Sequence, residues 1–253
     1  MKTETVELFY EELGQGKSVI FLHGFPLDHT TWLPVAHLMQ NKARCILPDL
    51  RGLGRSPLTG MDTGIPQMAS DVIRLMDNLH IFQAVIVGHS MGGYVAMQMA
   101  HSFPDRVVGL GLVATRTEPD TPEKSAERLA SRQDVLANGP DALISTMAAR
   151  LTDKPDILRQ IVPVMQRTSP QGIAMAQYAM AYREDATAWV RAIEYPVVVV
   201  AGGMDGISPL EGMKNLADSL QRGKFYSHPY ATHMIPMEEP GLIARALEET
   251  YFM

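Results

Sequence analysis

Residues 85–93 of the chain read VIVGHSMGG, and this stretch decides the fold. An apolar, β-rich run leads directly into Gly-x-Ser-x-Gly, and a segment with helical character follows it. A turn this tight requires glycine at positions 88 and 92, where a Cβ would clash, and it lifts the Ser90 hydroxyl clear of the sheet. The helix would offer backbone N–H groups and the positive end of its dipole to a developing oxyanion. The segment therefore predicts a strand, a nucleophile elbow at Ser90 and a helix.

The regions on both sides of this turn alternate between short β-rich runs and longer helix-like segments. The β-rich runs cover residues 6–12, 18–25, 43–50, 84–90, 107–115, 196–203 and 223–230. Several contain continuous apolar stretches, such as VIFL and VVVV, which are typical of strands with both faces covered by helices. Helices are predicted over 65–79, and from Met91 to a point before Pro104. The alternation indicates an α/β fold with a mostly parallel central sheet flanked by helices.

The pattern changes between residues 118 and 189, where no Val-rich strand occurs. Helical segments are separated by breaks at Gly139-Pro140, Lys154-Pro155 and Ser169-Pro170. A helical block of this length between two strands is most simply an insertion above one edge of the sheet. We therefore expect a core domain formed by residues 1–117 and 190–253, with a helical cap over 118–189.

The composition narrows the class of protein. A chain of 253 residues with 46% hydrophobic and 20% charged residues fits one large soluble domain, or a domain with a sizeable insertion. The net charge of -6 opposes binding to nucleic acid or to an anionic membrane. The single cysteine, Cys45, excludes an intramolecular disulfide and any Cys-rich metal site. Because MKTETVELFYEE (1–12) lacks the apolar core of a signal peptide and no apolar run reaches the ~18 residues of a membrane span, we expect a cytoplasmic protein.

A serine hydroxyl becomes a good nucleophile only when a base removes its proton and a third group orients that base. In this architecture the chain order is Ser, then Asp or Glu, then His. His228 and His233 are the histidines that follow the last long strand, and His228 falls inside the β-rich run KFYSHPY. His233 comes after that run, on a loop from which an imidazole can reach over the sheet edge. We therefore predict His233 as the general base.

Asp205 is the predicted acid. It follows VVVVAGG at the carboxyl end of a buried strand, where catalytic groups gather in open α/β sheets. Its carboxylate would accept the Nδ1 proton of His233 and hold the tautomer whose Nε2 faces Ser90. An ordinary Asp in a Gly-rich turn is the alternative interpretation. The rivals by residue type, none of which follows a strand so directly, are Asp185, Glu194 and Asp218.

A second loop at the sheet edge follows VIFL and reads HGFP (23–26). Acyl transfer needs two N–H donors on the carbonyl oxygen, one from the residue after the nucleophile and one from this early loop. Met91 and Phe25 are the predicted donors. His23 does not fit the triad by chain order, and we expect it to shape the loop.

Five motifs, present in the family's order, make the chain resemble the α/β-hydrolase superfamily, especially its serine esterases and lactonases. The motifs are HGFP (23–26), DLRGLGRS (49–56), GHSMGG (88–93), GGMDGISP (202–209) and THMIPMEEP (232–240). The resemblance covers nearly the whole chain apart from the helical insertion. It implies a core sheet with a helical cap, a Ser90, Asp205 and His233 triad, and an oxyanion hole formed by the Phe25 and Met91 N–H groups.

Other local sequence motifs give no support for a phosphate, metal or cofactor site. Residues 14–18, GQGKS, look like the end of a phosphate-binding loop, but Glu11 stands where glycine is needed and a strand follows instead of a helix, so we expect a hairpin turn. No HExxH motif or paired His-Asp cluster suggests a metal site, and no cofactor is expected. Thr232 stands where the resembled family usually has glycine before the histidine, which affects the fine geometry of that loop.

Methionine is abundant in the predicted cap, and its flexible side chain adapts to varied apolar ligands. Met147, Met175 and Tyr178 are candidate walls of a substrate pocket, although ordinary core packing explains them at least as well.

The sequence thus predicts a serine hydrolase that cleaves a carboxylic ester or lactone of a small to medium, largely apolar substrate through an acyl-enzyme. Neither nucleic acid nor a membrane is an expected partner. Enol-lactone hydrolysis, carbon–carbon bond hydrolysis and perhydrolysis with the same triad stay open. A ligand-binding receptor on the same fold is the non-enzymatic alternative.

Overall fold

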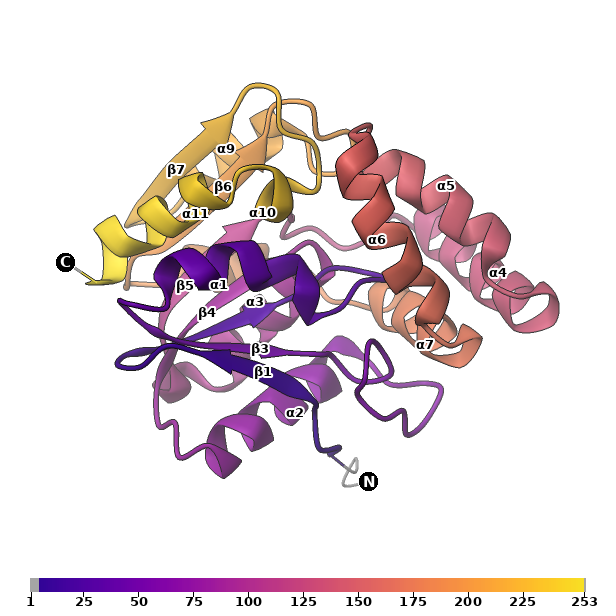
Figure 1. Cartoon of the computed structure of the whole chain (residues 1–253), viewed down its shortest axis with the longest axis horizontal. Coiled ribbons are helices and arrows are strands. Elements are labelled where there is room, and N and C mark those ends of the chain that lie inside the picture. Colours follow the sequence, from indigo (N-terminus) through magenta and orange to yellow (C-terminus); the bar gives the residue numbers. More distant parts are fainter. Residues whose placement is uncertain (1–4, 253) are drawn as a thin grey trace.

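The computed structural model describes residues 5–252; residue 253 and residues 1–4, which open the MKTETVELFYEE segment and the expected core domain, lie outside the described part. In the described part, seven strands form one sheet in the order β1-β3-β2-β4-β5-β6-β7 (Figure 1). The strands are β1 (Tyr10–Leu13), β2 (Ser18–Leu22), β3 (Arg44–Pro48), β4 (Ala84–His89), β5 (Val107–Val113), β6 (Val197–Gly202) and β7 (Gly223–His228). β1 pairs antiparallel with β3, and every other pairing is parallel. The predicted α/β fold with a mostly parallel sheet is confirmed.

Helices cover both faces of the sheet, because alternate residues of each central strand point to opposite sides. Ile20 and Leu22 of β2 belong to one hydrophobic cluster with α2 and α3, whereas Val19 and Phe21 belong to another with α1 and α11. The flanking helices are α1 (Leu33–Met39), α2 (Ile65–Asn78), α3 (Met91–Ser102), α9 (Leu210–Asp218), α10 (Ile235–Glu238) and α11 (Pro240–Leu247). The helices predicted over 65–79 and from Met91 are confirmed.

The first edge of the sheet differs from the sequence expectation. β1 begins at Tyr10 and not at residue 6, because the backbone before it bonds to side chains: the Val6 N–H donates to Asp71 Oδ1 at 3.1 Å, and the Phe9 N–H to Ser56 Oγ at 2.9 Å. The turn over residues 14–18 is not a hairpin, since β3 lies between β1 and β2 in the sheet. The expectation of a hairpin was therefore wrong.

Between β5 and β6 the chain forms the helical insertion, which Figure 1 shows gathered at one side of the sheet. Its helices are α4 (Pro122–Asn138), α5 (Asp141–Leu151), α6 (Pro155–Arg167), α7 (Pro170–Ala181) and α8 (Thr187–Arg191). The three predicted breaks are confirmed, since each falls between two of these helices. Ile144, Leu151 and Ile161 of the insertion pack with Leu27 and Met234 from loops of the sheet region. Along the described residues, none of the helices combines the length and the apolar character needed to cross a membrane.

Candidate active site

Ser90 sits in a strained turn between β4 and α3. Its φ of 53° lies in the left-handed region, which few residues other than glycine adopt. A Cβ on Gly88 would lie 2.3 Å from the Gly92 carbonyl oxygen, and one on Gly92 would lie 2.2 Å from the Leu22 carbonyl oxygen. The Ser90 N–H donates to the Val113 carbonyl at 3.0 Å, which ties the turn to the end of β5. The two glycines are thus required by direct backbone contact, as the sequence predicts.

The structure brings Asp205 and His233 together. Asp205 lies just beyond β6, and its Oδ2 is 2.8 Å from His233 Nδ1. Its other oxygen, Oδ1, accepts hydrogen bonds from the Ile207 N–H at 2.7 Å and the Ser208 N–H at 3.0 Å. Burial of the carboxyl opposes ionisation, but the charge of His233 and these hydrogen bonds outweigh it and lower the pKa of Asp205. An ionised Asp205 is therefore available to orient the imidazole.

His89, the variable residue inside Gly-x-Ser-x-Gly, holds the histidine loop against the elbow. Its Nε2 donates to the His233 carbonyl at 2.9 Å, and the two rings lie 5.0 Å apart. Burial, and then the charge of His233, lowers the pKa of His89 to about 3, so the ring stays neutral. Sequence reasoning missed this role, because the partner lies 144 residues away and no motif marks the pair.

The HGFP loop lies directly against the elbow. A Cβ on Gly24 would approach the Ser90 Cβ to 3.2 Å, so only glycine allows this contact. His23 is fully buried; its Nε2 accepts the Leu50 N–H at 2.9 Å, and its Nδ1 therefore donates to the Gly24 carbonyl at 2.9 Å. His23 thus supports the loop, as expected. The Phe25 N–H has no hydrogen-bond partner among the described residues.

Met91, the other predicted oxyanion donor, is the first residue of α3. The first N–H groups of a helix have no acceptor within the helix, so they are available to a ligand. The Phe25 N–H has no partner among the described residues, and the Met91 N–H lies at the start of a helix. Both are therefore available to a ligand oxygen near Ser90.

A cavity of about 660 Å³ opens above these groups. Ser90, His233 and Phe25 line its floor, and Met147 and Met180 contribute apolar wall from the insertion. Charged side chains line much of the remaining wall, so the cavity is more polar than the methionine content suggests. The structure thus joins the sheet edge and the insertion around one space.

Of the three candidate substrate-binding residues, one lines the cavity and two do not. Met147 lines the cavity. Met175 is fully buried in the larger hydrophobic cluster, with its Cε beside Gly52. Tyr178 packs against Tyr182 and under the Arg132 guanidinium, 4.9 Å from its ring centre. Neither Met175 nor Tyr178 is among the residues that line the cavity.

Thr232, the departure from the family pattern, connects the histidine loop to the insertion. Its N–H donates to Glu238 Oε2 at 2.8 Å, and its hydroxyl lies 3.0 Å from the Leu151 carbonyl at the end of α5. The buried Glu238 also accepts from Thr152 Oγ1 at 2.8 Å and forms an ion pair with Lys154 at 2.8 Å. A glycine at position 232 would lack the hydroxyl that makes part of this connection.

A buried group of Asp28, His29 and Asp49 could in principle hold a metal ion, since its ligand atoms lie within 4.8 Å of one another. The protein already uses these atoms: Asp49 Oδ1 accepts from the His29 N–H and Nδ1, each at 2.7 Å, and Oδ2 accepts from the Arg55 N–H at 2.8 Å. No sequence motif marks this His-Asp pair, because His29 and Asp49 lie 20 positions apart. The group organises the loop after β3.

The predicted base and its rival also differ in position. His233 is almost fully buried beside the cavity, whereas the His228 side chain is about one-third exposed at the end of β7, 3.5 Å from a Glu239 oxygen.

Comparisons with known proteins find relatives over nearly the whole chain. The chain is 30% identical to a pimeloyl-[acyl-carrier protein] methyl ester esterase of Chromobacterium violaceum, over 96% of this chain and 98% of the relative. It is 27% identical to 3-oxoadipate enol-lactonase 2 of Acinetobacter baylyi, over 98% and 94% of the two chains. A thermophilic esterase from Thermogutta terrifontis, solved with malate bound, superposes with a TM-score of 0.93 at 35% identity, covering 96% of this chain and 92% of the other. The model of the alpha/beta hydrolase family matches residues 19–246, and the chain belongs to that family.

Proposed function

We propose that this protein is a serine hydrolase of carboxylic esters or lactones that works through an acyl-enzyme. The observation that carries the proposal is the pairing of a buried Asp205 with His233, which lines one cavity together with the strained Ser90. Relatives named as esterases and as an enol-lactonase support the same reaction class.

In the proposed reaction, Ser90 Oγ attacks the substrate carbonyl while His233 Nε2 takes the hydroxyl proton. The negative charge that forms on the carbonyl oxygen is stabilised by the Phe25 and Met91 N–H groups. His233 then gives its proton to the departing alkoxide, which leaves an ester of Ser90. Water attacks this ester with His233 again as base, and the free acid leaves. Asp205 orients the imidazole and stabilises its charged form throughout.

A receptor that merely binds a ligand would not need this arrangement. A left-handed serine costs backbone strain, and a buried carboxylate costs desolvation unless a partner compensates it. Both features serve nucleophilic attack, which favours catalysis.

The first prediction concerns Ser90. A fluorophosphonate probe should label the wild-type protein and not Ser90→Ala, and the variant should lose a factor on the order of 10⁶ in kcat on p-nitrophenyl esters. Ser131→Ala is the matched control, because Ser131 lines the same cavity away from the elbow, and this variant should still be labelled. Mass spectrometry of the labelled peptide and stopped-flow assays measure the two effects. A Ser90→Ala preparation, free of contaminating esterase, that kept a tenth of the activity would contradict the proposal.

A further inference from the structure

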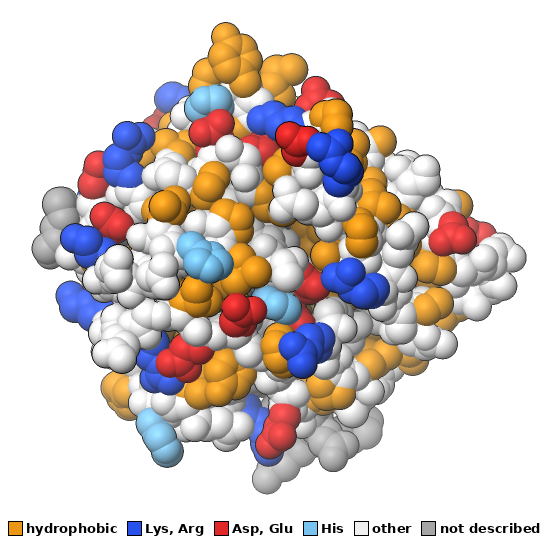
Figure 2. All heavy atoms as spheres, in the orientation of Figure 1, with side chains coloured by type: hydrophobic (Ala, Val, Ile, Leu, Met, Phe, Trp, Pro, Cys, Tyr) orange, Lys and Arg blue, Asp and Glu red, His pale blue; other side chains and the backbone are white. Residues whose placement is uncertain are grey.

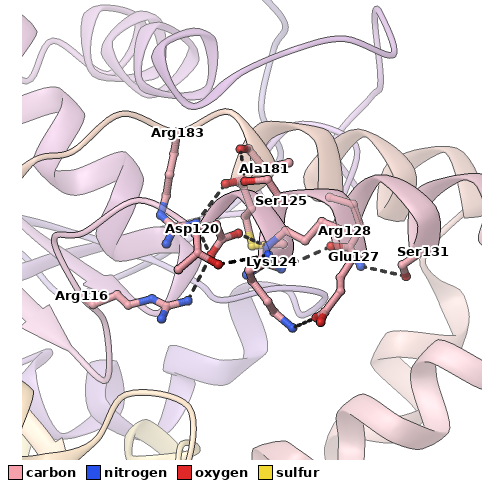
Figure 3. Close-up of polar contacts among 12 residues, drawn as sticks. Arg116, Asp120, Lys124, Ser125, Glu127, Arg128, Ser131, Ala181 and Arg183 are labelled. Carbon is pink, nitrogen blue, oxygen red and sulfur yellow. Dashed lines mark hydrogen bonds and ion pairs between the residues drawn. The ribbon is translucent and has the colours of Figure 1, made fainter.

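Three arginines surround one carboxylate on the wall of the cavity, and we call this group the arginine cluster: Arg116, Arg128 and Arg183 around Asp120 (Figure 3). Asp120 Oδ1 lies 2.9 Å from Arg183 Nη1 and 3.1 Å from Arg116 Nη2. Arg128 Nε donates to Asp120 Oδ2. The Asp120 side chain is fully shielded from solvent. Burial opposes its ionisation, but the arginine contacts outweigh it and lower the pKa of Asp120.

The cluster holds more positive than negative charge. One carboxylate neutralises one of its three guanidinium groups. The other charged groups around this wall are Lys124, paired with Glu127 at 2.6 Å, Arg150, and Asp134. Among the residues that line the cavity, four cations face three carboxylates, which leaves an excess of one positive charge. Arg150 forms no hydrogen bond or ion pair with any described residue.

The geometry argues against a purely structural clamp. Gathering three guanidinium groups around one shielded carboxylate costs desolvation and repulsion, and one arginine would be enough to pair with Asp120. Arg183 has the structural role, since it is almost completely buried, donates to the Met180 and Glu118 carbonyls, and lies 4.3 Å over the Tyr94 ring. Arg116 differs, because its side chain is 36% exposed and lines the cavity. A guanidinium has five N–H donors, and among the described residues Arg116 pairs with Asp120 and contacts the Tyr94 hydroxyl, while the Glu118 carboxylate also acts on its charge.

The chain holds Arg116 close to the nucleophile. Thr115, its neighbour in sequence, donates from Oγ1 to the Ser90 carbonyl at 2.8 Å. Tyr94, which Arg116 contacts, lies one turn along α3 from Ser90 and lines the same cavity. Spare donors of a positive group thus border the space in which a substrate of Ser90 would lie.

We propose that the arginine cluster is an anion subsite, and that the substrate is an ester or lactone that carries a free carboxylate away from its reacting carbonyl. The proposal rests on the hydrolase function argued above. Arg116 is the primary contact, because a guanidinium matches a carboxylate in charge and in its paired donors. Arg128 and Arg150 supply further positive potential across the cavity. The apolar wall at Met147 and Met180 then accommodates the methylene chain between the two ends of the substrate.

Two esters that differ only in their far end test the proposal. Monomethyl adipate ends in a carboxylate, and methyl adipamate ends in a neutral amide of nearly the same shape. The wild-type kcat/KM should favour the carboxylate, and Arg116→Gln should reduce that ratio by about 10- to 100-fold, the range expected for one hydrogen bond between charged groups. Arg132→Gln is the matched control, since Arg132 lies on α4, like Arg128 of the cluster, but pairs with Asp62 outside the cavity. The control should leave the ratio unchanged.

Binding measurements separate this subsite from the chemistry. Calorimetry with adipate and with adipamide needs no turnover, and adipate should bind more tightly to the wild type and lose that advantage in Arg116→Gln. If esters are hydrolysed without preference and adipate binds no better than adipamide, the anion subsite is wrong while the hydrolase stands. If adipate binds through Arg116 but no ester is hydrolysed, the anion subsite stands and the hydrolase function is wrong.

A second variant covers the case in which Arg116→Gln does not fold. Arg150→Gln removes a cation that forms no hydrogen bond or ion pair with any described residue, so the variant should fold and lower the carboxylate preference by a smaller factor. An unchanged preference in this variant, together with equal losses on both esters in a folded Arg116→Gln, would overturn the proposal.

Discussion

The sheet edge and the helical insertion hold their side chains around the cavity by different means. At the edge, most of these contacts are made by backbone groups. Carbonyl groups leave no room for a Cβ at Gly88 and Gly92, and two N–H groups bind the Asp205 carboxylate. In the insertion, long charged side chains hold one another, as Arg128 and Arg183 do around Asp120. Backbone contacts tolerate few substitutions, whereas side-chain pairs can be exchanged. We therefore expect the proposed chemistry to depend on the edge, and the proposed selectivity to depend on Arg116 and the insertion.

The largest effect on activity should come from removing a side chain of the proposed site at the sheet edge. His233→Ala removes the proposed base and should lower kcat/KM on a simple ester by about 10⁴- to 10⁶-fold, because nucleophile and base act as a unit. His228→Ala, at the end of β7, should stay within about twofold of the wild type, as is usual for a side chain outside the site. Steady-state assays at neutral pH give both values. Equal losses in the two variants would remove His233 from the role.

The contacts of Glu238, which connect the histidine loop to the insertion, should affect stability more than activity. Their effect on stability should depend on pH. Glu238 is buried, which opposes its ionisation, but Lys154, Thr232 and Thr152 outweigh burial and lower its pKa. A carboxyl group whose pKa is lower in the folded state stabilises the fold at pH values above its pKa in the unfolded chain, about 4.3. This stabilisation is lost as the pH falls through the folded-state pKa. Glu238→Gln should therefore be less stable by roughly 2 kcal/mol at pH 7. The difference from wild type should shrink as pH is lowered below about 4.3.

Urea unfolding of both proteins between pH 7 and pH 3 measures this dependence. Glu211→Gln is the control, since Glu211 is exposed on α9. A stability gap of constant size at every pH would show that Glu238 acts through packing and not through charge.

The smallest effect on hydrolysis of a simple ester should come from reshaping the insertion. Met147→Trp narrows the cavity and should shift the preferred acyl length, at about 1–3 kcal/mol for each methylene excluded, while acetyl esters are still hydrolysed. Met175→Trp should instead destabilise the fold by about 1–3 kcal/mol with the same chain-length profile, because Met175 is buried in the core. A panel of p-nitrophenyl esters and a thermal melt distinguish the two. The same profile in Met147→Trp and wild type would mean that Met147 does not contact the acyl group.

The same division explains how much the sequence could predict. Ser90, Asp205 and His233 follow apolar runs, and strand ends are visible in the local pattern, so the turn at Ser90 and the pairing of Asp205 with His233 could be predicted. The Gly-Pro and X-Pro breaks likewise located the inserted helices. These signals lie within a few residues of the feature that they predict.

Features that depend on distant partners were not predictable. Asp120 and Arg183 are 63 positions apart, and no residue near either one marks the contact. The position of β3 between β1 and β2 depends on sheet pairing, which the short turn after β1 does not reveal. For the same reason methionine content suggested an apolar cavity, while the charges that line it became visible only in the folded chain.

The order of strands in the sheet also bears on when the proposed enzyme becomes reactive. Ser90 follows β4, whereas Asp205 and His233 follow β6 and β7, the two strands that extend the sheet beyond β5. Synthesis proceeds from the N-terminus, so a chain that has folded only through β5 carries the elbow without an acid or a base. In the proposed mechanism, such a serine has no base to activate it. In that mechanism, a chain that ends before β6 has no activated serine, and reactivity begins only once β6 and β7 have joined the sheet.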